Sequence, residues 1–181
     1  ALEQDAVSVS AVMAAAATDR LPHDVTLRLT LYRDLPAADL TIALRKPPET
    51  WPESGWLCFP LAVSQPAFRL GRLGSIVDPL RDIVEGTNFH LLWLNSGLTV
   101  ADPQGKGVGL CPLDSPLVSL GEPGMLRYSL RCEPTKPIVY VNLFNNHWNT
   151  NFRSWWGGAW TSTVRLWAVE GEPPEAALLT P

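Results

Sequence analysis

The densest concentration of hydrogen-bonding and aromatic side chains lies between Asn142 and Gly158, in the run NLFNNHWNTNFRSWWGG. Asparagine and arginine can pair with sugar hydroxyl groups, and a tryptophan ring offers a flat apolar face to a pyranose. This segment is therefore a candidate loop for contact with a carbohydrate or with a neighbouring domain. The same residue types suit a buried polar network with the tryptophans in the core, and this second interpretation stays open. The candidate residues are Asn145, Asn146, His147, Trp148, Asn149, Thr150, Asn151, Arg153, Trp155 and Trp156.

Metal or acid–base chemistry would need histidines that converge with other polar groups. His23, His90 and His147 are far apart and lack the HxH or HExxH spacing of a local metal site. His90 lies in the apolar run FHLLWL, where a hydrogen-bonded core histidine is the commoner outcome. His147 has a polar, aromatic setting, in which it can bind a substrate or orient an asparagine. We predict no metal site and no cofactor in this chain.

Glycoside hydrolysis normally needs two carboxyl groups, one protonated and one ionised, on either side of the scissile bond. Every acidic cluster of the chain lies near a turn signal, where aspartate typically caps or bends the backbone. These clusters are Asp34 with Asp39, Asp78 with Asp82 and Glu85, and Asp102 with Asp114. A GxSxG elbow and a complete phosphate-binding loop are both missing from the sequence. We therefore predict no catalytic residue in this chain.

Composition limits the class of protein. The 181 residues are 46% hydrophobic and 18% charged, which indicates a globular chain with one domain, 1–181. The formal net charge of −4 and a pI near 5.3 argue against binding to nucleic acid. The sequence has no apolar run of about 18 residues to span a membrane, so we expect a soluble protein and, if it is bacterial, a cytoplasmic one.

Three cysteines at wide spacing, Cys58, Cys111 and Cys132, predict reduced thiols and no disulfide framework. The chain begins at Ala1 without an initiator methionine and enters an alternating pattern within a few residues. We therefore expect it to be part of a longer polypeptide, with the missing part on the N-terminal side.

Alternating apolar and polar residues predict strands along most of the chain. The clearest case is Val25 to Tyr32, and the neighbouring run Leu40 to Leu44 should pair with it in antiparallel fashion. Prolines around Trp56 to Phe59 confine any strand there to an edge or an end. Other predicted strands are Ala6 to Met13, Leu126 to Cys132, Ile138 to Phe144 and Thr161 to Val169, with a buried central strand at Phe89 to Leu94 and a hairpin of Leu98 to Ala101 with Val108 to Cys111.

No segment has a sustained helical pattern, and 17 prolines with 13 glycines suit many short strands joined by turns. The predicted fold class is all-β, a multi-stranded antiparallel β-sandwich.

Several short motifs resemble the C-terminal β-rich region of glycoside hydrolase family 38, the α-mannosidase-like proteins. The most specific is Asn145 to Phe152, which is similar to that family's Asn-Asn-Tyr-Trp-x-Thr-Asn-Tyr motif, with His147 and Phe152 in place of the tyrosines. The other motifs are Tyr32-Arg33-Asp34-Leu35-Pro36, Lys46-Pro47, Trp51-Pro52-Glu53, Phe59-Pro60, Asp114-Ser115-Pro116-Leu117 and Leu120-Gly121.

This resemblance implies a galactose mutarotase-like sandwich and a non-catalytic role. An N-terminal catalytic domain of the same polypeptide would be the partner, and it would hold the zinc and the nucleophile of a retaining glycoside hydrolase. Asn146, Trp148, Thr150 and Asn151 would then lie where the sandwich approaches the catalytic domain or the sugar cleft.

Two alternatives stay open. A free-standing carbohydrate-binding module would need Trp148, Trp155 and Trp156 to face solvent. A mutarotase-like sugar epimerase would need a histidine and a carboxylate in one cleft. The pairs that the sequence offers are His147 with Asp102, Asp114 or Glu53.

Overall fold

The computed structural model describes residues 1–19, 21–125, 131–147, 151 and 153–171. In these residues every regular element is a strand, and the strands form two antiparallel sheets. The strands are β1 (Leu2–Gln4), β2 (Ser8–Ala15), β3 (Asp24–Tyr32), β4 (Ala37–Lys46), β5 (Ser54–Pro60), β6 (Ala67–Arg72), β7 (Ser75–Val77), β8 (Leu92–Trp93), β9 (Leu98–Ala101), β10 (Lys106–Pro112), β11 (Leu117–Leu120), β12 (Ile138–Asn145) and β13 (Gly158–Glu170).

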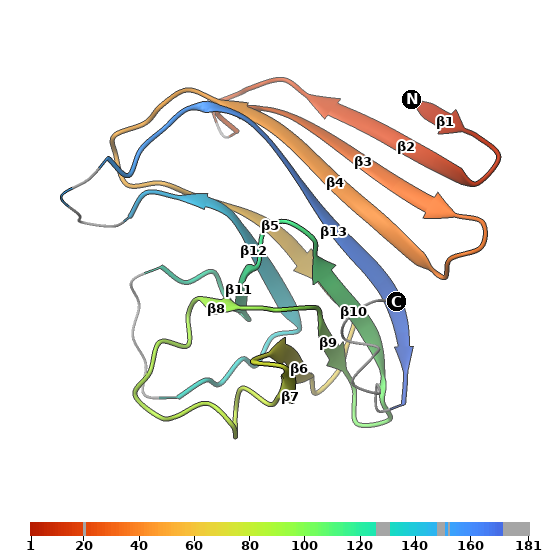
Figure 1. Cartoon of the computed structure of the whole chain (residues 1–181), viewed down its shortest axis with the longest axis vertical. Helices are drawn as coiled ribbons and strands as arrows, with labels where there is room; N and C mark the ends of the chain where they lie inside the picture. The colour runs from red at the N-terminus through yellow and green to blue at the C-terminus, as the bar shows by residue number, and fades with distance from the viewer. Residues whose placement is uncertain (20, 126–130, 148–150, 152, 172–181) are drawn as a thin grey trace.

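The larger sheet has the strand order β1-β2-β3-β4-β13-β10-β9-β6-β7, and the smaller sheet has the order β5-β12-β11-β8 among the described residues. Figure 1 shows the larger sheet curving over the smaller one, with β1 and β2 at its far end. The long strand β13 sits near the centre of the larger sheet, where it pairs with β4 on one side and with β10 on the other. The predicted β-sandwich is therefore confirmed.

Strand alternation directs one set of side chains into the space between the sheets. On β12, Val139 and Val141 are fully buried, while Tyr140 between them lies on the opposite face. The core combines residues of both sheets, including Phe68, Leu70, Leu98, Val100, Leu110, Val118, Val139, Val141 and Val164. Burying each of these side chains contributes about 1.5–3 kcal/mol, so this layer holds the sheets together.

Most of the predicted strands are confirmed, generally with longer bounds. The pairing of the runs at 25–32 and 40–44 is that of β3 with β4, and the predicted hairpin is that of β9 with β10. The proline-bounded segment around Trp56 forms β5, an edge strand of the smaller sheet. The prolines predicted this edge position because a proline has no backbone N–H to donate to a second neighbouring strand.

The prediction of a central strand at Phe89 to Leu94 is wrong. Only Leu92 and Trp93 form a strand, and this strand, β8, lies at an edge of the smaller sheet. The apolar character of the run reflects its packing, since Phe89, Leu92 and Leu94 are all buried. Most of the strand predicted from Leu126 lies outside the described residues, and its last two positions, Arg131 and Cys132, are not in a strand.

Within the described part of the chain, no helix has the length and hydropathy that crossing a membrane requires.

Candidate functional site

Asn146, directly after β12, binds the backbone of the segment that precedes β5. The Asn146 side chain donates hydrogen bonds to the carbonyl oxygens of Glu49 and Trp51, each over 2.9 Å, and its Oδ1 accepts one from the Glu53 amide over 2.5 Å. Asn145 donates to Asn142 Oδ1 over 2.8 Å. Asn146 therefore connects the end of β12 to residues 49–53, whereas the bond of Asn145 stays within β12.

Lys46 is the charged centre of this region. Its Nζ donates to the carbonyl oxygens of Pro47 at 2.9 Å and Trp156 at 3.1 Å, and forms an ion pair with Glu53. The rings of Phe144 and Trp160 lie 5.3 and 5.9 Å from the ammonium group. The cavity beside these residues holds only about 10 Å³, so it leaves no room for a ligand in this conformation.

The other predicted contact residues lie around this network. His147 is half-buried directly after Asn146, and Asn151 is exposed. Arg153 donates to the Trp155 carbonyl over 2.8 Å. Trp155 and Trp156 are 37% and 55% exposed. Trp148, Asn149 and Thr150 lie outside the described residues, and contact of this segment with a carbohydrate stays a prediction.

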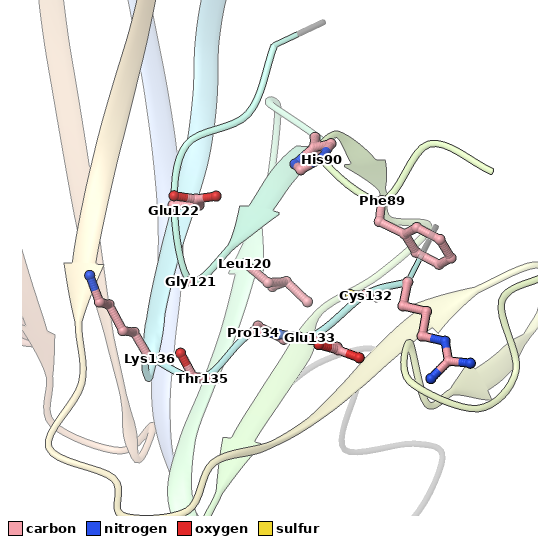
Figure 2. A pocket seen from close by; sticks show the side chains of 11 residues that line it. Phe89, His90, Leu120, Gly121, Glu122, Cys132, Glu133, Pro134, Thr135 and Lys136 are labelled. Carbon is pink, nitrogen blue, oxygen red and sulfur yellow. The ribbon is translucent and has the colours of Figure 1, made fainter. Parts of the chain in front are cut away.

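A larger cavity, of about 390 Å³, lies at the end of the smaller sheet. Its size falls in the range of small-molecule sites. Its walls come from the segment before β8, the end of β11 and the chain that leads into β12 (Figure 2). The lining residues are Phe89, His90, Leu120, Gly121, Glu122, Arg131, Cys132, Glu133, Pro134, Thr135 and Lys136.

Ser119 on β11 positions the wall of this pocket that carries His90. Its fully buried hydroxyl donates to the His90 carbonyl oxygen and accepts a hydrogen bond from the Gly124 amide at 3.2 Å. A Cβ atom on Gly124 would lie 2.4 Å from the His90 Cβ, so only glycine permits this close approach. The serine and the glycine together fix His90 and the segment that carries Glu122.

His90 supplies the wall with an imidazole. Its Nε2 atom is shielded from solvent and has no hydrogen-bond partner among the described residues. A buried polar atom without a partner is energetically costly. The expected hydrogen-bonded core histidine is thus replaced by a half-buried histidine in a pocket wall.

Charged groups of both signs surround the cavity. Figure 2 shows Glu122 and Lys136 on one side of the pocket and Glu133 on the other. Arg131 forms an ion pair with Glu85 at 2.9 Å. Burial, with a smaller effect of the Asp78 charge, raises the pKa of the Cys132 thiol to about 11. The thiol therefore stays protonated at neutral pH, and Cys132 is not a nucleophile there.

The carboxylates that the sequence paired with His147 have structural roles. Asp102 accepts hydrogen bonds from the amides of Gln104 and Lys106 and so closes the β9–β10 turn. Asp114 accepts from the Thr163 amide on β13. Glu53 is paired with Lys46.

The structure brings His90, Glu122 and Glu133 together instead, and sequence reasoning did not foresee this grouping. Glu122 and Glu133 lie 32 and 43 residues after His90, and the pairing of β11 with β8 and β12 makes the three residues neighbours. A single sequence carries no local signal of this grouping, because the spacing of the three residues follows no short motif.

Comparisons with known proteins yield structural likenesses alone. No protein-family model matches the chain, and no curated protein is similar to it in sequence. Among solved structures, the chain is similar to a protein assigned as an aldose 1-epimerase from Escherichia coli K12, with 12% identity and a TM-score of 0.46 over 93% of this chain and 67% of that one. A galactose mutarotase-like protein from Lactobacillus casei has 11% identity and a TM-score of 0.44 over 93% and 72%. A galactose mutarotase related enzyme from Lactobacillus acidophilus has 8% and 0.41 over 93% and 70%.

The predicted kinship with the C-terminal region of glycoside hydrolase family 38 is wrong. No model of that family matches, and the solved structures that resemble this chain over 93% of its length are aldose 1-epimerase and galactose mutarotase-like proteins. The motif at Asn145 was misleading because its asparagine Asn146 has a structural role, binding backbone groups of residues 49–53. The catalytic domain and the zinc were expected only because of this kinship, so nothing now supports them.

Proposed function

We propose that the protein is a mutarotase-like sugar epimerase whose pocket of about 390 Å³ binds a monosaccharide unit. The observation that carries this proposal is the presence of the His90 imidazole and the carboxylates of Glu122 and Glu133 in one cavity. A histidine and a carboxylate in one cleft are the minimum that acid–base chemistry at a sugar ring requires.

Anomer interconversion needs two proton transfers, one at the anomeric hydroxyl and one at the ring oxygen, which are both bonded to the anomeric carbon. A carboxylate, Glu122 or Glu133, takes the proton of the anomeric hydroxyl, while protonated His90 gives a proton to the ring oxygen. The bond between the anomeric carbon and the ring oxygen breaks, and the open-chain aldehyde forms. After rotation about the adjacent carbon–carbon bond, the ring closes on the other face and both protons return, so atoms and charges balance.

Histidine is the side chain that most often serves as a general acid or base in enzymes. The His90 imidazole lies in the pocket wall, but its Nε2 is shielded from solvent in this conformation, so binding a sugar oxygen requires the His90 side chain to turn toward the cavity. Hydrogen bonds of this type often reach their final geometry only with substrate bound. Lys136 and Thr135, also in the lining, supply donors for further hydroxyl groups.

The test is the rate of anomer exchange, measured by NMR exchange spectroscopy on D-glucose, D-galactose and D-mannose. We expect catalysed exchange of at least one sugar. His90→Gln should lower the exchange rate by a factor of about 10²–10⁴, and so should either Glu122→Gln or Glu133→Gln, depending on which carboxylate is the base. Glu3→Gln is the control, because Glu3 is an exposed carboxylate that pairs with Arg28 far from the pocket. Unchanged rates in all three pocket variants, each shown to be folded, would overturn the proposal.

A second candidate function is carbohydrate binding at the surface of Trp155 and Trp156, which are both exposed. Trp156 packs on Trp160 with ring centroids 4.6 Å apart and planes tilted by 53°, so its orientation is fixed. Titration with mannosides, followed by tryptophan fluorescence, should show saturable binding that Trp156→Ala abolishes and Trp51→Ala retains. Trp51 is a suitable control because it is more exposed and lies in another segment.

A further inference from the structure

The outer face of the smaller sheet, turned away from the core, carries aromatic side chains. On β5 and β12, Leu57, Phe59, Val139 and Val141 pack into the core, and the residues between them point the other way. Register places Tyr140 opposite Cys58, and Asn142 opposite Trp56. We call Trp56 and Tyr140 the aromatic face.

The two rings of the aromatic face are fixed relative to each other. Their centroids are 6.4 Å apart and their planes meet at 88°, an edge-to-face arrangement. The Trp56 indole N–H donates to the Ser54 hydroxyl over 2.9 Å, which sets the orientation of the indole ring. Both residues are only half-buried. A rigid, partly exposed aromatic surface can bind a ligand with little loss of side-chain entropy.

The aromatic face lies next to the strand that supports the pocket wall. Tyr140 is paired in register with Ser119, the residue whose hydroxyl holds His90 and Gly124 at the pocket wall. Burial, the neighbouring Cys58 and, as the smallest effect, the Glu122 charge raise the pKa of Tyr140. Glu122 and Lys136 lie on the side of the pocket opposite to Cys132 and Glu133 (Figure 2). Because Tyr140 is the register partner of Ser119 and Trp56 lies one strand further, a ligand that extends from the pocket wall across the outer face meets Tyr140 and then Trp56.

We propose that the substrate is an oligosaccharide, with its reducing-end unit in the pocket and the following units over Tyr140 and Trp56. This proposal rests on the proposed function, because it takes the pocket to be the site of the reacting unit. Aromatic rings suit the C–H faces of sugars, and a further sugar is the occupant that proximity to a polar, monosaccharide-sized pocket favours. The inter-strand spacing of about 4.8 Å puts Trp56 two strands away from Ser119, so the face accommodates more than one unit.

Calorimetric titration of the full chain tests the proposal with matched sugars: D-glucose against maltotriose and cellotriose, and D-galactose against β-1,4-galactotriose. We expect at least one trisaccharide to bind about tenfold more tightly than its monosaccharide. Trp56→Ala and Tyr140→Ala should remove most of this preference and leave monosaccharide affinity unchanged, while Trp56→Phe should retain part of it. Trp51→Ala, which removes an exposed tryptophan elsewhere, should have no effect.

Equal affinity for monosaccharides and trisaccharides in the unmodified protein, or a preference that both alanine variants keep, overturns the proposal. The proposal is also overturned if the unmodified protein shows no sugar preference and Trp56→Ala changes its self-association. That result would make the face a contact between copies of the chain. Anomer exchange separates the two proposals. Exchange without trisaccharide preference leaves the proposed function standing, whereas trisaccharide binding that depends on Trp56 without exchange leaves a binding face and no epimerase.

Discussion

Lys46 is a buried charged residue, and its ammonium group needs hydrogen-bonding partners. It is 5% exposed, and its three ammonium donors are all used, by two carbonyl oxygens and the Glu53 carboxylate. A buried charge is tolerated only with such complete pairing. The sequence showed Lys46 beside two prolines, but its burial depends on β13 and β12, which are distant along the chain.

Removing the partner of Lys46 should destabilise the fold strongly. Glu53→Gln leaves the buried ammonium without a counter-charge and should lower the free energy of unfolding by about 3 kcal/mol, measured by urea titration of tryptophan fluorescence. The double variant Lys46→Met with Glu53→Gln should recover most of this loss, because no buried charge remains. A Glu53→Gln variant as stable as the unmodified protein would show that the ion pair does not stabilise the fold.

Asn146 should be needed to order the segment before β5. Asn146→Ala removes three hydrogen bonds to residues 49–53 and should cost about 2 kcal/mol in the free energy of unfolding. Amide hydrogen exchange at Glu53 should accelerate more than exchange in the core strands. Asn145→Ala, which among the described residues loses the side-chain bond to Asn142, is the control and should have the smaller effect. Equal exchange rates in both variants would contradict this role.

At the scale of strands, the sequence predicted best where one face is polar and the other apolar. β3 and β4 follow this rule, and their pairing was predicted correctly. Prediction failed at Phe89 to Leu94, because an apolar run does not distinguish a central strand from a buried loop next to a short edge strand. The pocket could not be predicted for the same reason, since its walls are loops that the pairing of β11 brings together.

Three strands of the larger sheet are connected by side chains on its outer face. Tyr32 on β3 donates to Asp39 on β4 over 2.7 Å, and Arg165 on β13 binds both oxygens of that carboxylate over 2.7 and 2.8 Å. The hydrogen bonds from Arg165, together with those from Tyr32, hold the pKa of Asp39 below its usual value although burial opposes this. The folded state therefore favours the ionised carboxylate.

This depressed pKa gives a prediction for acid unfolding. The contribution of Asp39 is fully present above its unfolded pKa of about 4 and is lost as the pH falls toward the lower folded pKa. Asp39→Asn should lower the free energy of unfolding at pH 7 by about 3 kcal/mol and flatten its dependence on pH below about 5. Tyr32→Phe, which removes one hydrogen bond, should produce a smaller change in the same direction. An unchanged pH profile in Asp39→Asn would contradict the prediction.

At the scale of the whole molecule, the larger sheet extends beyond the layer that covers it. The smaller sheet packs on its centre, whereas β1, β2 and β3 continue outward (Figure 1). Their inward-facing residues continue the rows of the core, since Leu29 pairs with Leu40 and Val9 pairs with Leu31. The alternating pattern predicted which residues share this face. It could not predict whether a second layer covers them, because that depends on how far the smaller sheet, formed by strands between residues 54 and 145, extends.

The inward face of these outer strands should behave as an exposed apolar patch. Leu2, Met13 and Leu31 are 81%, 57% and 49% exposed, and such patches bind hydrophobic dyes. The double variant Met13→Lys with Leu31→Lys should weaken the fluorescence of anilinonaphthalene sulfonate by at least half. The urea midpoint should change little, since each side chain is about half-exposed and loses little packing. Leu73→Lys changes an isolated exposed leucine and should leave dye binding intact. Unaltered dye fluorescence in the double variant would place the dye site elsewhere, and a marked loss of stability would show that these side chains belong to the core.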